Sequence, residues 1–117
     1  MPRDTQSYLW DVCDSAEAIT QFTAGRTLED YLADRQIRSA VERQFEIIGE
    51  ALNRLSKEAP LMAARIPELS QIVAFRNLLI HGYATVEDAI VWRTVQEDLP
   101  KLYETAAMLL AELSEQP

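Results

Sequence analysis

Apolar side chains recur every three or four positions along most of the chain, which is the spacing of helices that bury one face. The first such stretch runs from Asp4 to about Ala24 and carries Leu9, Val12, Cys13, Ala16, Ile19 and Phe22. Gly25 follows it, and glycine commonly occupies the position just after a helix. The pattern therefore predicts a first amphipathic helix that ends before Gly25.

A second set of signals leads into the longest apolar stripe. Thr27, followed by Glu29 and Asp30, predicts the cap of a helix over residues 28–33. This helix either stops there or continues directly into the stretch from residue 34 to residue 57. That stretch carries its apolar residues on one side, at Ile37, Val41, Phe45, Ile48, Leu52 and Leu55.

Two prolines, Pro60 and Pro67, bracket a loop or a single turn after the long helix. The next helix is predicted from about Glu68 to His81, and Gly82 suits the position just after its end. The apolar side of this helix is expected to consist of Leu69, Ile72, Val73, Leu79 and Ile80.

The last helical stretch begins at Thr85, which with Asp88 three residues later resembles a capping box. Pro100 falls inside this stretch, so we expect a kink or a break into two helices near Leu99. The apolar stripe continues on both sides of the proline, through Ile90, Val91, Val95, Leu99, Leu102, Ala106, Leu109 and Leu113.

The predicted elements are all helices, because no segment alternates polar and apolar residues with a period of two. The sequence also has no internal repeat and no low-complexity segment. Helices joined by short loops favour an antiparallel arrangement. The sequence therefore predicts an all-α fold, a single domain over residues 1–117 built as an antiparallel bundle of four to five helices.

Composition changes this picture mainly through charge. The chain has 19 acidic and 11 basic residues, a net charge of −8. Such acidity disfavours an extended nucleic-acid-binding surface, which is normally basic, but it leaves room for a local site that handles one phosphate. No apolar run has the length of a membrane span, and the N-terminal residues show no signal peptide. We therefore expect a cytoplasmic protein without membrane association.

Candidate chemistry is concentrated in the segment over residues 75–83. His81 is the only histidine of the sequence and Cys13 the only cysteine, so one chain has no histidine-based or Cys/His metal site. Glycine patterns that bind nucleotides are missing as well. We therefore expect neither a metal nor a cofactor.

Arg76 lies close to the apolar side of its predicted helix, and a buried guanidinium needs a partner. His81 follows five residues later, about 140° around the helix and about 7.5 Å along its axis. Both heads would border one cleft if the helix end turned His81 further round. The spacing by itself favours a structural role, in which Arg76 pairs with a glutamate of the long helix such as Glu46 or Glu50.

The segment Arg76-Asn-Leu-Leu-Ile-His81-Gly-Tyr83 resembles the R-x4-H-x-Y motif of HepT-like toxins in the HEPN superfamily. The resemblance extends beyond the motif. Residues 38–52 are similar to the long second helix of that family, and residues 91–102 are similar to its final helix. The similar segments cover most of the chain in the same order.

The resemblance implies a metal-independent endoribonuclease that acts as a homodimer, with the motifs of both chains facing a shared cleft. It makes Arg76 and His81 the catalytic pair. It also implies a cognate minimal nucleotidyltransferase antitoxin as partner, which adds AMP to Tyr83. Asn77 is a supporting candidate that orients a phosphate or holds His81, although a solvent-facing amide fits its position equally well.

This chemistry agrees with the residues present. RNA supplies its own nucleophile, the 2′-hydroxyl, so the protein needs to supply proton transfer and charge stabilisation. Histidine exchanges protons near neutral pH, and arginine matches phosphate oxygens. Two other functions remain open at this point. One is a non-catalytic HEPN module that docks a nucleotidyltransferase, and the other is a helical dimerisation protein without a ligand.

Overall fold

The computed structural model describes residues 4–81 and 87–115. These residues form helices joined by short turns, with no strand among them. Four helices are long and two are short, which confirms the predicted all-α bundle. In chain order they are α1 Thr5–Thr23, α2 Leu28–Ala33, α3 Arg35–Glu58, α4 Pro60–Ala63, α5 Leu69–His81 and α6 Asp88–Glu115.

Side-chain caps explain where the first helices begin. The Asp4 carboxylate accepts a hydrogen bond from the backbone N–H of Ser7 at 2.8 Å and starts α1. Thr27 and Asp30 form a reciprocal capping box at the start of α2, as the sequence indicates. Asp34 ends α2 and caps α3, which separates the two helices. Of the two predicted alternatives, the short second helix is therefore the one that forms.

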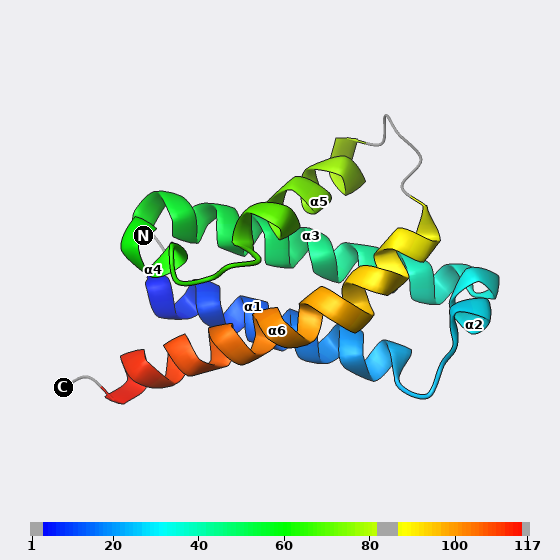
Figure 1. Ribbon diagram of the computed structural model, residues 1–117, viewed down its shortest axis with the longest axis horizontal. Helices are drawn as coiled ribbons and strands as arrows, with labels where there is room; N and C mark the ends of the chain where they lie inside the picture. The colour runs from blue at the N-terminus through cyan, green and yellow to red at the C-terminus, as the bar shows by residue number, and fades with distance from the viewer. Residues whose placement is uncertain (1–3, 82–86, 116–117) are drawn as a thin grey trace.

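The four long helices alternate in direction and lie in the order α5, α3, α1, α6 (Figure 1). Helix α1 packs against both α3 and α6, and α5 packs against α3. The molecule is elongated, with extents of 48 × 31 × 25 Å. None of the helices in the described ranges is long and apolar enough to cross a membrane.

The core lies where α1, α3 and α6 meet, and it consists of the predicted apolar stripes. Fully buried side chains come from each of the three helices: Leu9, Val12 and Ile19 from α1, Val41, Phe45, Ile48, Leu52 and Leu55 from α3, and Leu102, Ala106 and Leu109 from α6. Tyr31 of α2 is also buried and packs its ring against Trp92, with centroids 5.4 Å apart. Burial of these faces stabilises helices that would be marginal alone.

The structure contradicts the sequence interpretation at Ile80 and excludes one of its two alternatives at Pro100. Of a kink and a break into two helices, the break does not occur, because α6 continues through Pro100. The proline removes one backbone hydrogen bond, but Leu99 and Leu102 on either side are buried and hold both halves of the helix in the bundle. In α5, Ile80 is exposed, while Phe75 is buried edge-to-face against Phe45. The predicted cap at Thr85 lies outside the described residues.

Candidate active site

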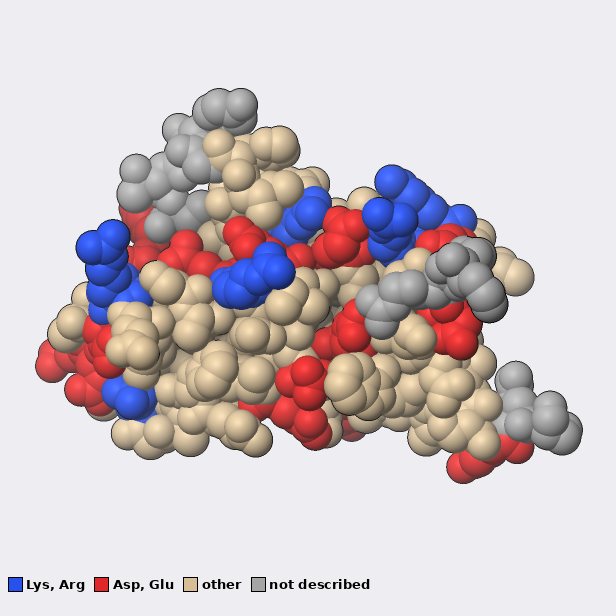
Figure 2. All heavy atoms as spheres, turned by 180° about the vertical axis from the view of Figure 1, so that it is seen from behind, with Lys and Arg blue, Asp and Glu red and all other residues tan. Residues whose placement is uncertain are grey.

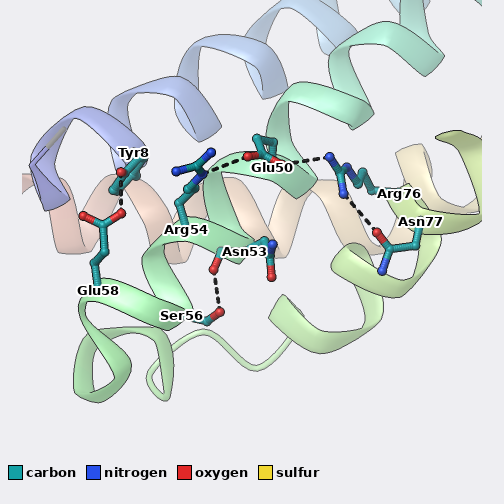
Figure 3. A network of polar contacts seen from close by, with 8 residues as sticks. All are labelled: Tyr8, Glu50, Asn53, Arg54, Ser56, Glu58, Arg76 and Asn77. Atoms are coloured by element: carbon teal, nitrogen blue, oxygen red, sulfur yellow. Dashed lines mark hydrogen bonds and ion pairs between the residues drawn. The ribbon is translucent and has the colours of Figure 1, made fainter. Parts of the chain in front are cut away.

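The guanidinium of Arg76 sits between α5 and α3, where it pairs with a carboxylate. Its Nη2 donates to Glu50 Oε2 at 2.8 Å, and only 19% of the arginine side chain is exposed. The other carboxylate oxygen, Oε1, accepts from Arg54 Nε at 2.9 Å. Figure 3 shows Glu50 between the two arginines, with each of its oxygens turned to one of them. The partner that burial of Arg76 demands is therefore Glu50 of the long helix.

Asn77 holds the other end of the same guanidinium. Its Oδ1 accepts a hydrogen bond from Arg76 Nη1 at 3.0 Å (Figure 3). Both terminal nitrogens of Arg76 are thus held by protein oxygens. The Nε atom is buried and has no hydrogen-bond partner among the described residues. The structure therefore gives Asn77 a contact with Arg76 that the sequence interpretation did not consider.

Gly49 makes room for this arrangement. A Cβ atom at this position would overlap Cβ and Cγ of Arg76 and lie 3.0 Å from its Cδ. Glycine in the middle of a helix costs about 0.5–1 kcal/mol relative to alanine, so its presence in α3 has to serve something else. Here it lets the arginine stem cross α3 in direct contact with the backbone. The sequence carries a signal for this contact, since Gly49 interrupts an otherwise strong helix.

A groove of about 630 Å³ runs past Arg76 along α3. Its lining mixes both charges: Arg43, Arg54 and Arg76 face Asp11, Glu46, Glu50 and Glu58. On the face shown in Figure 2, blue and red side chains of the described residues alternate across the upper half and form no broad basic area. The groove is therefore suited to a few placed contacts and poorly suited to tracking a long phosphate backbone.

The charge of Glu50 is secured by its neighbours. The hydrogen bond from Arg54, followed by the positive charge of Arg76, holds the pKa of the Glu50 carboxyl below its usual value against the opposing effect of desolvation. The carboxylate therefore stays ionised at neutral pH and keeps attracting both guanidinium groups. Both arginines that bind this carboxylate line the same groove as Glu50 itself.

The other two predicted site residues are His81 and Tyr83. His81 is the last residue of α5 and is exposed, and it is not among the residues that line the groove around Arg76. One chain thus places the two predicted catalytic residues on the same helix without enclosing them in one cleft. Tyr83 lies outside the described residues. In the described ranges, no group of three or more histidine, cysteine, aspartate or glutamate side chains is placed to hold a metal ion.

The profile of a family described as "Ribonuclease HepT-like" matches residues 12–109. The chain belongs to the ribonuclease HepT-like family. Among its relatives it is 36% identical over 102 residues to a probable ribonuclease HepT of Thermococcus cleftensis, covering 87% of this chain and 92% of that protein. It is 33% identical over 100 residues to a putative RNase of Methanocaldococcus jannaschii, covering 86% and 91%. No solved structure matches it.

Membership in the HepT-like family confirms the resemblance seen in the motif and in the two longer segments. The match begins in α1 and ends in α6, so it includes the helices that build the Arg76 contacts. The roles of Arg76, Asn77, His81 and Tyr83 stay predictions, since a family match over the whole bundle does not assign chemistry to single side chains.

Gly49→Ala tests whether the packing of α5 against α3 requires the close approach of the Arg76 stem to the α3 backbone. Alanine favours the helix by about 1 kcal/mol, but its Cβ would displace the Arg76 stem, and overpacking of this kind costs about 1–3 kcal/mol. We therefore expect a net loss in the free energy of unfolding, measured by urea denaturation. Ser39→Ala, at an exposed position of the same helix, is the control and should be neutral or slightly stabilising. A Gly49→Ala protein as stable as wild type would mean that α5 is not held against α3 in this way.

Proposed function

We propose that this protein is a metal-independent endoribonuclease and the toxin of a pair whose antitoxin is a minimal nucleotidyltransferase. Arg76 and His81 are its catalytic residues. The observation that carries the proposal is the placement of Arg76, whose guanidinium is held at both terminal nitrogens beside an open groove, on the same helix that ends at His81. The ribonuclease names of its relatives support the same substrate class.

The reaction is a transfer of the phosphoryl group within RNA. The 2′-oxygen attacks the adjacent phosphorus, the bond to the 5′-oxygen breaks, and the products are a 2′,3′-cyclic phosphate and a 5′-hydroxyl. One group takes the proton from the 2′-hydroxyl and another gives a proton to the leaving 5′-oxygen. An imidazole can fill either role near neutral pH, as the base when it is neutral or as the acid when it is protonated. The Arg76 guanidinium stabilises the charge that gathers on the non-bridging oxygens.

The two proton transfers of this reaction also favour a homodimer. The reaction uses one base and one acid, whereas the sequence has a single histidine. His81 is exposed at the end of α5, next to the groove-lining Ile80, and this exposed position favours a cleft completed by a second copy. Exposed Leu78 and Ile80, next to His81 on α5, supply apolar surface for that contact. The dimer would then bring two histidines and two arginines together.

A second function has one observation in its favour. The groove has four acidic and three basic lining residues, and the whole chain carries a charge of −8. A non-catalytic module that docks a nucleotidyltransferase would need no basic RNA surface. Such a module would also have no use for a proton-transfer residue, so the behaviour of His81 separates the two functions.

His81→Ala is expected to lower RNA cleavage by about 10²- to 10⁴-fold, the usual contribution of general acid–base catalysis. The substitution should leave the fold intact, because an exposed histidine at a helix end contributes about 1 kcal/mol or less through the helix dipole. Arg76→Lys keeps the charge and loses the planar fork, so it should also be badly impaired. Cleavage is measured on purified proteins, with circular dichroism as the test of folding and with a chelator that should have no effect.

Arg93→Lys is the matched control for the arginine variant. Arg93 is an exposed arginine on α6 that pairs with a glutamate one turn away, so its replacement should leave cleavage unchanged. The wild-type products should end in 2′,3′-cyclic phosphate. Full activity in a folded His81→Ala protein would contradict the enzyme proposal and leave the docking module as the better account.

Tyr83 is the proposed acceptor of AMP. Incubation with a minimal nucleotidyltransferase of the proposed antitoxin class and with ATP should add the mass of AMP to the wild-type chain and suppress RNA cleavage. Tyr83→Phe removes the accepting oxygen, so it should stay unlabelled and active. Intact-mass spectrometry reads the labelling directly. Equal labelling of the two proteins would place the acceptor elsewhere.

A further inference from the structure

Glu50 is the residue through which α3 acts on Arg76. Its carboxylate receives one hydrogen bond on each oxygen, from Arg76 on α5 and from Arg54 one turn along its own helix. With both oxygens bound, the carboxylate is fixed on α3 rather than free to follow the arginine. A fixed acceptor on one helix therefore determines where a guanidinium on another helix can sit.

The remaining contacts of Arg76 restrict it further. Asn77 binds the opposite terminal nitrogen at 3.0 Å, and Gly49 brings the stem down onto the α3 backbone. Of the five N–H groups of a guanidinium, the contacts to Glu50 and Asn77 occupy two. The plane of the group is thus set from two sides while other N–H groups remain for a ligand at the groove.

We propose that Glu50 is a positioning residue, which holds the Arg76 guanidinium in the orientation that stabilises the transition state of RNA cleavage. This inference rests on the proposed ribonuclease function. Glu50 does not touch the RNA. It acts through Arg76, and Arg54 supports it by binding its second oxygen. Preorganised donors need no rearrangement when charge develops on the phosphate, which is the reason that a fixed orientation accelerates the reaction.

A competing possibility is that Glu50 merely occupies Arg76 and keeps phosphate away. The two roles predict opposite kinetics. A blocking carboxylate would raise KM and leave kcat untouched, so its neutralisation would improve the enzyme. A positioning carboxylate affects kcat, because small misplacements of a catalytic group cost about 10²-fold in rate.

The decisive variant is Glu50→Gln, which keeps the shape and removes the charge. We expect kcat to fall by about 10- to 100-fold, while KM stays the same or decreases because the groove loses a negative charge. Glu46→Gln is the matched control. Glu46 lies one turn earlier on α3, lines the same groove and pairs with Arg43 at 3.3 Å, without a contact to Arg76. Its KM should also stay the same or decrease, and its kcat should not change.

The outcomes separate this inference from the function on which it rests. Unchanged kcat in Glu50→Gln, with cleavage by wild type and none by Arg76→Ala, would overturn the positioning role alone. Equal behaviour of wild type and Arg76→Ala would instead overturn the ribonuclease proposal. If Glu50→Gln does not fold, Arg54→Met replaces it, since Arg54 is exposed and its loss frees one oxygen of Glu50. We expect a smaller drop in kcat there, and no drop would again overturn the inference.

A measurement without RNA tests the geometry directly. The Nε–H group of Arg76 gives an NMR signal whose order parameter reports how firmly the guanidinium is held. We expect a high order parameter in wild type and in Glu46→Gln, and a clearly lower one in Glu50→Gln. An Arg76 side chain that is equally ordered in all three proteins would show that Glu50 does not position it.

Discussion

A guanidinium that is four-fifths buried needs a carboxylate within reach, and in this bundle that need ties α5 to α3 through Arg76 and Glu50. The contact depends on a glycine at position 49, since any larger side chain there would meet the arginine stem. It also depends on Arg54, which binds the second oxygen of the carboxylate. The contacts that satisfy the buried charge of Arg76 also orient its guanidinium toward the groove. Packing of the bundle therefore places this candidate catalytic residue.

The acidity of the chain is compatible with RNA cleavage if recognition is local. Metal-independent cleavage by the 2′-hydroxyl asks for a base, an acid and a cation at one phosphate, and none of these needs a wide basic surface. A mixed groove with three arginines and four carboxylates supplies the cation in a fixed place. His81 does not line that groove in its own chain and lies exposed at the end of α5. The proposed dimer follows from this separation.

Much of the fold could be predicted, because helix periodicity and capping act within a few residues of each other. The cap at Thr27, the stop at Gly25 with φ of 73° and the buried stripe of α3 all follow from local rules. The sequence also requires a partner for Arg76, but Glu46 and Glu50 were equal candidates. Which glutamate pairs with Arg76 depends on the register between α3 and α5, and local sequence rules do not determine that register. In the structure the register is set at Gly49, which leaves room for the Arg76 stem. Periodicity likewise does not reveal that Pro100 is tolerated inside α6, since buried neighbours on both sides decide it.

The central claim is that cleavage takes place in a cleft to which two chains contribute. Mixed dimers of one wild-type chain and one Arg76→Ala/His81→Ala chain, purified by two different affinity tags, test it most directly. We predict that the mixed dimer loses nearly all RNA cleavage although one of its motifs is intact, because a single histidine cannot be base and acid at once. A mixed dimer with half the activity of wild type, or a wild-type chain that cleaves RNA as a monomer, would contradict it.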